Sequence, residues 1–229
     1  MNGGPGMHRI AVYDLDKTLL RHATFTPFLA FAAWKRSRWR VLLLPIWIAV
    51  MLAYKLGAMS RGRLKELGLR MILGKRVDGA VVEELGERFG QAVWPNWLSH
   101  EAGVALEVER AEGWTLVLAT AAMDFVAGPI ARKAGTTDVI ATRHRLTDGV
   151  GPVRIEGRNC YAAEKLARFE SWLDDAELDR ANCEIRFYSD SISDAPLLDF
   201  ADDAVLVDPS VSARRVAAVR GWRTVNFNS

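Results

Sequence analysis

The sequence predicts an α/β protein with a doubly wound, mostly parallel sheet and an inserted α-helical cap. Short apolar runs alternate with helical patterns over most of the 229 residues, and one long helical block interrupts this alternation after the first run. Such alternation is typical of parallel sheets, because each crossover helix returns the chain to the same end of the sheet. We therefore assign residues 1–21 and 107–229 to the core and residues 22–106 to the cap.

Each expected element follows from its own pattern. A buried strand comes first, His8 to Tyr13, and helical spacing or solid apolar runs then predict cap helices over 25–34, 41–56, 63–73 and 81–93. Core strands are expected at 114–120, from 184, from 203 and at 222–227, with helices over 125–134, 162–173, 196–200 and 211–219. Residues 138–155 alternate and turn at Asp148-Gly149, which predicts an irregular hairpin.

Composition excludes several classes of protein. Half of the residues are hydrophobic and a quarter are charged, which excludes a chain disordered throughout. Cys160 and Cys183 lack paired spacing, so neither a disulfide framework nor a CxxC zinc site is expected, and a cytoplasmic setting is favoured. The Gly-rich start does not resemble a secretory signal. Met7 is a second candidate start, so it stays open whether residues 1–6 are native.

The charges are distributed unevenly along the chain. Between Arg21 and Arg76, twelve basic residues stand against one acid, Glu66, whereas the remainder of the chain carries nine more acidic than basic residues. This split predicts that the cap meets an anionic surface or an anionic substrate.

Acidic and polar side chains follow successive predicted strands, at the sheet edge where open α/β proteins bind ligands. Several carboxylates buried together without partners would be prohibitive, so a hard divalent cation such as Mg²⁺ is expected. One aspartate then suits nucleophilic attack on phosphorus, and a second suits proton transfer. The residues concerned are Asp14, Asp16, Thr120, Lys165, Asp190 and Asp194.

Four segments in this order, "DLDKT", "LVLAT", a downstream lysine and "YSDSISD", resemble the motifs of the haloacid dehalogenase superfamily of phosphatases, whose core is Rossmann-like. The resemblance implies Asp14 as nucleophile, through an aspartyl-phosphate, and Asp16 as general acid and base. It implies Mg²⁺ bound by the carboxylates of Asp14 and Asp190 and by the backbone carbonyl of Asp16. A lone DxD is more often a turn or a helix cap, so the expectation rests on the four segments together.

The same resemblance implies a phosphate site. Thr18 would shape its loop, while Thr120, the amide of Ala121 and Lys165 would hold the phosphoryl oxygens. Asp194 would orient Lys165 or a metal-bound water.

The long helical insertion resembles the cap of the phosphoserine phosphatase-like branch. Phosphoserine phosphatases carry a glutamate shortly after the first motif, where it holds the substrate ammonium. Here no acid occurs between Asp16 and Glu66, which argues against phosphoserine as the substrate.

A basic and apolar segment stands in the cap instead, "WKRSRWRVLLLPIWIAVMLAYK". Its fourteen apolar residues, Val41 to Tyr54, are short of the roughly 20 that span a bilayer, so a buried helix, an interfacial segment or a re-entrant hairpin all stay open. The basic and tryptophan flanks favour contact with a membrane surface through residues 35–55. In this character the chain resembles phosphatidylglycerophosphatases of the C type, which implies an anionic phospholipid substrate at the cytoplasmic membrane face, with the enzyme peripheral on it.

Two alternatives stay open beside the lipid phosphatase. One is a soluble phosphatase of a small phosphorylated metabolite, whose basic cap recruits an anionic substrate. The other is a membrane-binding adaptor that has lost catalysis. Nucleic acid is not expected as a partner, because the continuous apolar run suits lipid better than a polar phosphate groove. The oligomeric state stays open.

Overall fold

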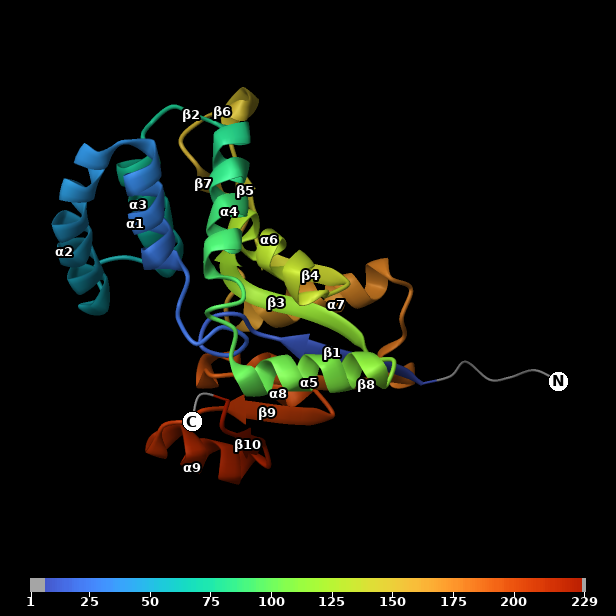
Figure 1. Ribbon diagram of the computed structural model, residues 1–229. Coiled ribbons are helices and arrows are strands. Elements are labelled where there is room, and N and C mark those ends of the chain that lie inside the picture. Colours follow the sequence, from blue (N-terminus) through green and yellow to red (C-terminus); the bar gives the residue numbers. More distant parts are fainter. Residues whose placement is uncertain (1–6, 228–229) are drawn as a thin grey trace.

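The structure, a computed structural model, describes residues 7–227, so the question of whether residues 1–6 are native lies outside the described residues. Within these described residues, six parallel strands form one sheet in the order β10-β9-β8-β1-β3-β4 (Figure 1). They are β1 (His8–Tyr13), β3 (Thr115–Met123), β4 (Asp138–Thr142), β8 (Cys183–Ser189), β9 (Asp203–Val207) and β10 (Arg223–Val225). This architecture confirms the predicted α/β class.

Helices cover both faces of the sheet. On one face, α5 (His100–Ala111) and α6 (Asp124–Ala134) bury an apolar layer that includes Tyr13 and Leu118. On the other face, α7 (Ala163–Asp175), α8 (Ala195–Phe200) and α9 (Val211–Arg220) bury a second layer that includes Val12 and Val117. Successive residues of β1 and β3 point to opposite faces, so both strands are buried on both sides and read as continuous apolar runs.

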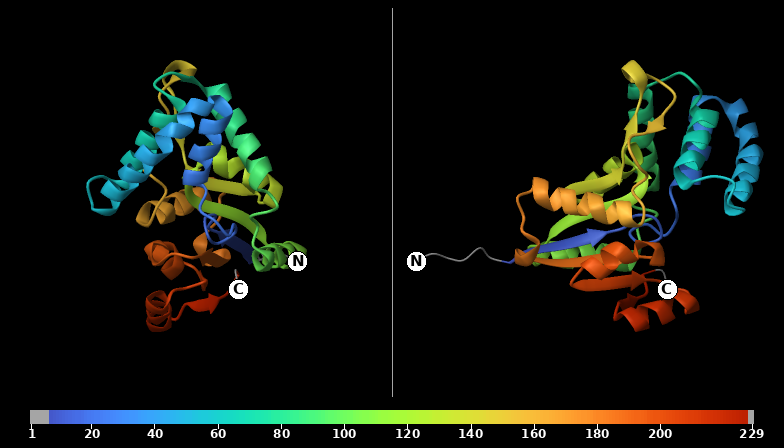
Figure 2. Two further views of the ribbon diagram at one scale, coloured as in Figure 1. Left: turned by 60° about the vertical axis from the view of Figure 1, so that its left-hand side comes forward. Right: turned by 180° about the vertical axis from the view of Figure 1, so that it is seen from behind.

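The inserted helices form a lobe beside the carboxyl end of β1 (Figures 1 and 2). It comprises α1 (Phe25–Arg36), α2 (Leu44–Lys55), α3 (Arg61–Leu73) and α4 (Gly79–Val93), of which α4 packs against α6 of the core. The predicted single helix over 41–56 is wrong in its first part: a 3₁₀ helix, η1 (Arg38–Leu43), precedes α2. Pro45 lies in the first turn of α2, where its missing N–H leaves no bond unmade.

The predicted hairpin over 138–155 is only half correct. Residues 138–142 form β4, an edge strand parallel to β3 in the main sheet. Within residues 143–155, β5 (His144–Arg145) pairs antiparallel with β7 (Arg154–Ile155). The strand between them, β6 (Val150–Gly151), instead pairs antiparallel with β2 (Val77–Asp78) from the inserted helical block. The part of the chain that the structure describes also contains the 3₁₀ helices η2 (Thr147–Gly149), η3 (Arg180–Asn182) and η4 (Ile192–Asp194).

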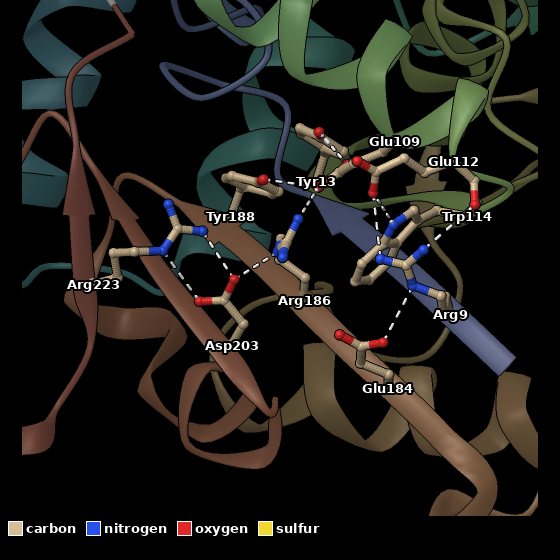
Figure 3. Close-up of polar contacts among 10 residues, drawn as sticks. All are labelled: Arg9, Tyr13, Glu109, Glu112, Trp114, Glu184, Arg186, Tyr188, Asp203 and Arg223. Atoms are coloured by element: carbon tan, nitrogen blue, oxygen red, sulfur yellow. Dashed lines mark hydrogen bonds and ion pairs between the residues drawn. The ribbon is translucent and has the colours of Figure 1, made fainter. Parts of the chain in front are cut away.

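Helix α5 lies across the boundary predicted at residue 107. It was not among the expected elements, and it packs against β3 of the core. Its buried Glu109 accepts hydrogen bonds from the hydroxyls of Tyr13 and Tyr188 and pairs with Arg186 at 3.0 Å (Figure 3). The division into core and cap stays a prediction, and α5 favours ending the cap before residue 100.

This network sets the register of the two central strands. Tyr13 ends β1, Tyr188 lies at the end of β8, and their rings stack with centroids 4.5 Å apart (Figure 3). Arg9 and Arg223 extend the network to Glu112 and Asp203 at its two sides. The two strand ends are therefore fixed side by side, immediately before the acidic motifs.

None of the helices within residues 7–227 combines the length and the apolar character needed to cross a bilayer.

Close packing of α4 on α6 yields a stability prediction. A Cβ added at Gly86 would lie 1.8 Å from the carbonyl oxygen of Phe125, so Gly86→Ala must push two helices apart. We expect the free energy of unfolding to fall by about 1–3 kcal/mol, measured by urea denaturation. Gly128→Ala in α6 is the control: its Cβ would meet only the flexible Arg132 side chain at 3.6 Å, and helix propensity predicts a gain of up to about 1 kcal/mol. Equal effects of the two substitutions would contradict the packing argument.

Candidate active site

A buried lysine connects two of the predicted site carboxylates. Nζ of Lys165 donates to Oδ1 of Asp14 at 2.8 Å and to Oδ2 of Asp194 at 2.6 Å. All three side chains are almost fully buried. Charge-assisted hydrogen bonds in a buried setting are strong and directional, so this pairing fixes the orientation of both carboxylates.

The fold brings these residues together from three distant parts of the chain. Asp14 follows β1 directly, and its backbone amide donates to the carbonyl of Tyr188 on β8 at 2.9 Å. Lys165 lies in the first turn of α7, which begins after Ala162, a non-glycine residue with φ of +54°. Asp194 begins α8, and its Oδ2 also accepts from the hydroxyl of Ser189 at 2.8 Å. The three segments that carry these residues therefore meet at the carboxyl edge of the sheet.

Asp16 lies in the loop that follows Asp14. Its Oδ1 accepts from the backbone amide of Thr24 at 2.8 Å, at the start of the cap. Lys17 adopts a left-handed φ of +62°, which turns the chain sharply between Asp16 and Thr18. Because Thr24 leads directly into α1, Asp16 is tied to the base of the inserted lobe.

The loop after β8 is tied to the first motif. The backbone amide of Asp190 donates to the hydroxyl of Thr18 at 2.9 Å, and Thr18 is fully buried. This contact holds the segments that carry Asp14 and Asp190 against each other. Thr18 thus lies where a loop-shaping residue is expected.

The third segment lies at the end of β3. The hydroxyl of Thr120 accepts from the amide of Ala122 at 3.0 Å, which fixes its rotamer. The carbonyl of Ala121 accepts from the hydroxyl of Thr142 at 2.8 Å and from the ammonium of Lys65, a residue of the cap helix α3. The peptide chain around Ala121 is therefore held from the core and from the cap.

Burial shapes the electrostatics of the carboxylates. Burial raises the pKa of Asp14 to about 7; Lys165 counteracts this, while Asp194 and Asp190 add to it. Burial likewise raises the pKa of Asp190 to about 6, and burial also raises the pKa of Asp16 although the Thr24 contact opposes it. For Lys165, burial disfavours the ammonium, but Asp14 and Asp194 outweigh burial and raise its pKa.

The donor set fits a hard divalent cation. Four carboxylates, those of Asp14, Asp16, Asp190 and Asp194, stand against two buried ammonium groups, Lys165 and Lys65, which leaves an excess of negative charge. Within residues 7–227, no three His, Cys, Asp or Glu side chains converge into a metal site by themselves. The predicted ligand set needs only two side chains and one backbone carbonyl, and oxygen ligands with room for water suit Mg²⁺.

Sequence reasoning missed several polar residues at this edge of the sheet. Lys65 was counted only as part of the basic cap, and Asn159, Thr142 and Ser189 were not singled out. One pattern identifies Lys65: α3 buries Leu64, Lys65, Gly68, Leu69, Ile72 and Leu73, so a lysine occupies the apolar face of an amphipathic helix.

The comparison with known proteins agrees with the geometry. The haloacid dehalogenase-like hydrolase family matches residues 11–199. Protein CicA of Caulobacter vibrioides is 32% identical over 207 residues, which is 89% of this chain and 88% of CicA. Phosphoserine phosphatase SerB1 of Mycobacterium tuberculosis is 30% identical over 115 residues, 50% of this chain and 37% of that protein.

Among solved structures, a protein of unknown function from Bordetella pertussis Tohama I superimposes with a TM-score of 0.87 at 28% identity. The match covers 96% of this chain and 99% of that one, so the similarity extends over nearly the whole of both chains. With the family match spanning both the first motif and the loop after β8, this chain belongs to the haloacid dehalogenase-like hydrolases and is a phosphatase of that family.

Proposed function

We propose that the protein is an Mg²⁺-dependent phosphomonoester hydrolase that works through an aspartyl-phosphate on Asp14. The observation that carries this proposal is the buried ammonium of Lys165, in contact with both Asp14 and Asp194 at the carboxyl edge of the sheet. A carboxylate held in this way has one oxygen bound and oriented. The other oxygen is available for attack on phosphorus.

The proposed mechanism has two steps. In the first, a carboxylate oxygen of Asp14 bonds to phosphorus as the ester oxygen leaves, and Asp16 donates a proton to the leaving oxygen. In the second, Asp16 takes a proton from a water that attacks the same phosphorus, which releases phosphate and restores Asp14. Burial raises the pKa of Asp16 above its ordinary value, which makes its carboxyl a better proton acceptor than an exposed aspartate.

Lys165, Thr120 and the amide of Ala121 would hold the phosphoryl oxygens. Asp14, Asp190 and the carbonyl of Asp16 would hold Mg²⁺, which supplies positive charge to offset the phosphoryl group. Asp194 acts as a positioning residue, since its contacts are to Lys165 and Ser189.

As the substrate we propose an anionic phospholipid such as phosphatidylglycerophosphate, reached at the cytoplasmic membrane face. Support comes from α2, which lies at the outer edge of the inserted lobe (Figure 1). This helix buries only Trp47 and leaves large apolar side chains exposed. Leu42 is 75% exposed and Leu56 87% exposed. Other exposed large apolar side chains of α1, η1 and α2 are Trp34, Trp39, Ile46, Ile48 and Leu52, and we call this set the outer apolar surface.

Basic side chains border this outer apolar surface. The guanidinium of Arg38 lies 4.4 Å from the Trp34 ring centroid, and that of Arg40 lies 5.3 Å from the Trp39 ring centroid. Apolar side chains beside cations are what an anionic bilayer surface binds, and each basic residue near such a surface contributes about 1 kcal/mol. A peripheral position on the membrane is therefore the interaction we propose for residues 35–55.

The alternative is a soluble phosphatase of a small phosphorylated metabolite. Lys65, on the buried face of α3, favours this alternative, because such a cation attracts an anionic substrate without any lipid. A membrane-binding adaptor without catalysis is disfavoured by the intact Asp14, Lys165 and Asp194 contacts.

Removal of the nucleophile tests the catalytic proposal. Asp14→Asn keeps the shape of the side chain but removes its charge, and we expect kcat for a simple phosphomonoester to fall at least ~10³-fold. Chelation of Mg²⁺ with EDTA should abolish wild-type activity, and added Mg²⁺ should restore it. Asp174→Asn, on the exposed side of α7, is the matched control and should keep full activity. Phosphatase activity that survives Asp14→Asn would refute the assignment.

The raised pKa values predict how stability depends on pH. Because burial raises the pKa of Asp14 from 3.8 to about 7, the native protein binds more protons than the unfolded chain within this window. This proton binding adds to the free energy of unfolding. The contribution is fully present below about pH 4 and is lost as pH rises through 7. Asp190, with a pKa of about 6, acts in the same direction.

Urea midpoints of the metal-free protein at pH 5 and pH 8 measure this effect. We expect a lower midpoint at pH 8, a smaller drop in Asp14→Asn, and a smaller drop with Mg²⁺, which favours the ionised carboxylates. Asp174→Asn should behave like wild type. An identical drop in wild type and Asp14→Asn would show that Asp14 does not titrate in this range.

Vesicle flotation tests the membrane proposal. The wild type should float with phosphatidylglycerol vesicles and hydrolyse phosphatidylglycerophosphate in preference to soluble phosphomonoesters. The double variant Ile48→Ser with Leu52→Ser should remain in the aqueous fraction, because it makes the outer apolar surface polar. Val219→Ser is the control, since Val219 is 88% exposed on α9 of the core. Wild type that stays in the aqueous fraction and shows no lipid preference would favour the soluble phosphatase.

A further inference from the structure

Lys65 is a buried cation on the inner side of the cap. Its side chain lies on α3 and the residue is only 6% exposed. The ammonium donates to the carbonyl of Ala121 and, at 2.6 Å, to Oδ1 of Asn159. Among residues 7–227, no carboxylate lies within ion-pair distance of it. Its two hydrogen bonds within the described residues therefore go to neutral acceptors.

A buried ammonium without a counter-ion is costly, since burial removes the hydration of the charge. The effect is visible in its acidity: burial lowers the pKa of Lys65 to about 8, even though Asp16 and Asp14 attract the ammonium. Packing alone would be better served by an apolar residue at this point of the buried face of α3. An anion that arrives beside Lys65 would supply the missing charge.

Asn159 supplies a second donor at the same place. Its Oδ1 accepts from Lys65 and from the hydroxyl of Thr142 at 3.2 Å, so the opposite atom, Nδ2, points away from them. Nδ2 is buried and has no hydrogen-bond partner among the described residues. Buried amide donors are nearly always paired, so this one indicates an acceptor that the protein itself does not provide.

A groove open to solvent reaches Asn159, the hydrogen-bond partner of Lys65. It has a volume of about 580 Å³ and lies between the start of α3 and the segment from Ile155 to Glu164, with Asn159 in its wall. Arg61, Arg63 and Arg158 line it, and the guanidinium of Arg61 lies 3.8 Å from the Tyr161 ring centroid. Arg61 and Lys65 are four residues apart and share one face of α3.

The two acids of the groove already have partners. Glu66 accepts from the amide of Ile155 at 2.9 Å, and Glu164 pairs with Arg168 at 3.0 Å. The groove thus keeps an excess of positive charge. Its volume lies within the range of small-molecule sites, about 300–1,000 Å³.

The position of this groove relates it to the reaction. Lys65 contacts Ala121, whose amide is proposed to hold the phosphoryl oxygens, and Asn159 precedes Lys165 by six residues in the same segment. Lys65 and Asn159 therefore lie next to the residue that is proposed to hold the phosphoryl oxygens.

We propose that Lys65 and Asn159, with Arg61 behind them, form a recognition site for a second anionic group, carried on the leaving group of the substrate. This inference rests on the proposed phosphatase function and narrows its substrate class. The group is a carboxylate, a phosphodiester or a further phosphate. A lipid head group and a small soluble metabolite both meet this requirement, and the test below separates them.

A matched pair of soluble substrates tests the site. Glycerol 3-phosphate and 3-phosphoglycerate differ in one position, where a neutral hydroxymethyl replaces a carboxylate. We expect kcat/KM of the wild type to be at least ~10-fold higher for 3-phosphoglycerate, mainly through KM. Lys65→Met should bring the ratio of the two kcat/KM values close to one, whereas Lys65→Arg should keep a preference for the carboxylate. Lys75→Met, at an exposed cap position, should leave the ratio unchanged.

Binding provides a measurement that does not depend on turnover. In the Asp14→Asn protein, calorimetry should give a Kd for 3-phosphoglycerate at least ~10-fold below that for glycerol 3-phosphate, and adding Lys65→Met should remove the difference. Thermal unfolding monitored by circular dichroism verifies that each variant is folded. Short-chain phosphatidylglycerophosphate, which carries a phosphodiester, forms the lipid arm: a Lys65-dependent preference for it over 3-phosphoglycerate identifies the lipid source, and the reverse order identifies a soluble one.

The outcomes separate the two proposals. Asp14-dependent hydrolysis of p-nitrophenyl phosphate with no Lys65-dependent preference, in turnover and in binding, would overturn the recognition site and leave the phosphatase intact. Absence of Asp14-dependent hydrolysis of every substrate would overturn the proposed function itself.

Discussion

The arrangement of the site depends on one buried ion triad, in which the ammonium of Lys165 lies between the carboxylates of Asp14 and Asp194. Removing Lys165 would leave two buried carboxylates without a counter-charge, which typically costs about 3–5 kcal/mol. A buried ion triad seldom stabilises a fold more than apolar packing of the same volume does. Replacing all three residues with apolar ones is therefore not expected to lower the free energy of unfolding much. The triad therefore makes sense as a device for orienting the nucleophile, and the fold supports it.

The position of the triad depends on the pairing register of β1 and β8. Tyr13 and Tyr188 stack on each other and both donate to Glu109, so the ends of β1 and β8 stay level although 175 residues separate them (Figure 3). A slip of one residue in either strand would move Asp14 or Asp190 to the opposite face of the sheet. The network beneath the sheet edge and the triad above it thus act on the same two strands.

Much of this site was predictable because it follows from the ends of strands. An aspartate directly after a buried strand, such as Asp14, is placed by topology alone, and parallel strands bring Asp190 to the same edge. The register of β4 and the existence of α5 were not predictable in the same way, because α5 carries a buried Glu109 and exposed Val104 and Val108 that obscure its apolar face. The contacts of Asn159 lay beyond sequence reasoning, since its partners, Lys65 and Thr142, come from distant segments.

The basic side chains of the cap lie in two different environments in the folded protein. On the outer side, the exposed Arg38 lies beside the exposed Trp34, where a cation remains hydrated and acts on a surface. On the inner side, Lys65 is buried against the core, where a cation acts on one anion at short range and with little screening. The two sides therefore differ in their response to salt: contact with a surface weakens as ionic strength rises, while recognition beside Lys65 is largely retained. A single count of basic residues cannot separate these roles, because only the packing of α3 decides which of the cations loses its water.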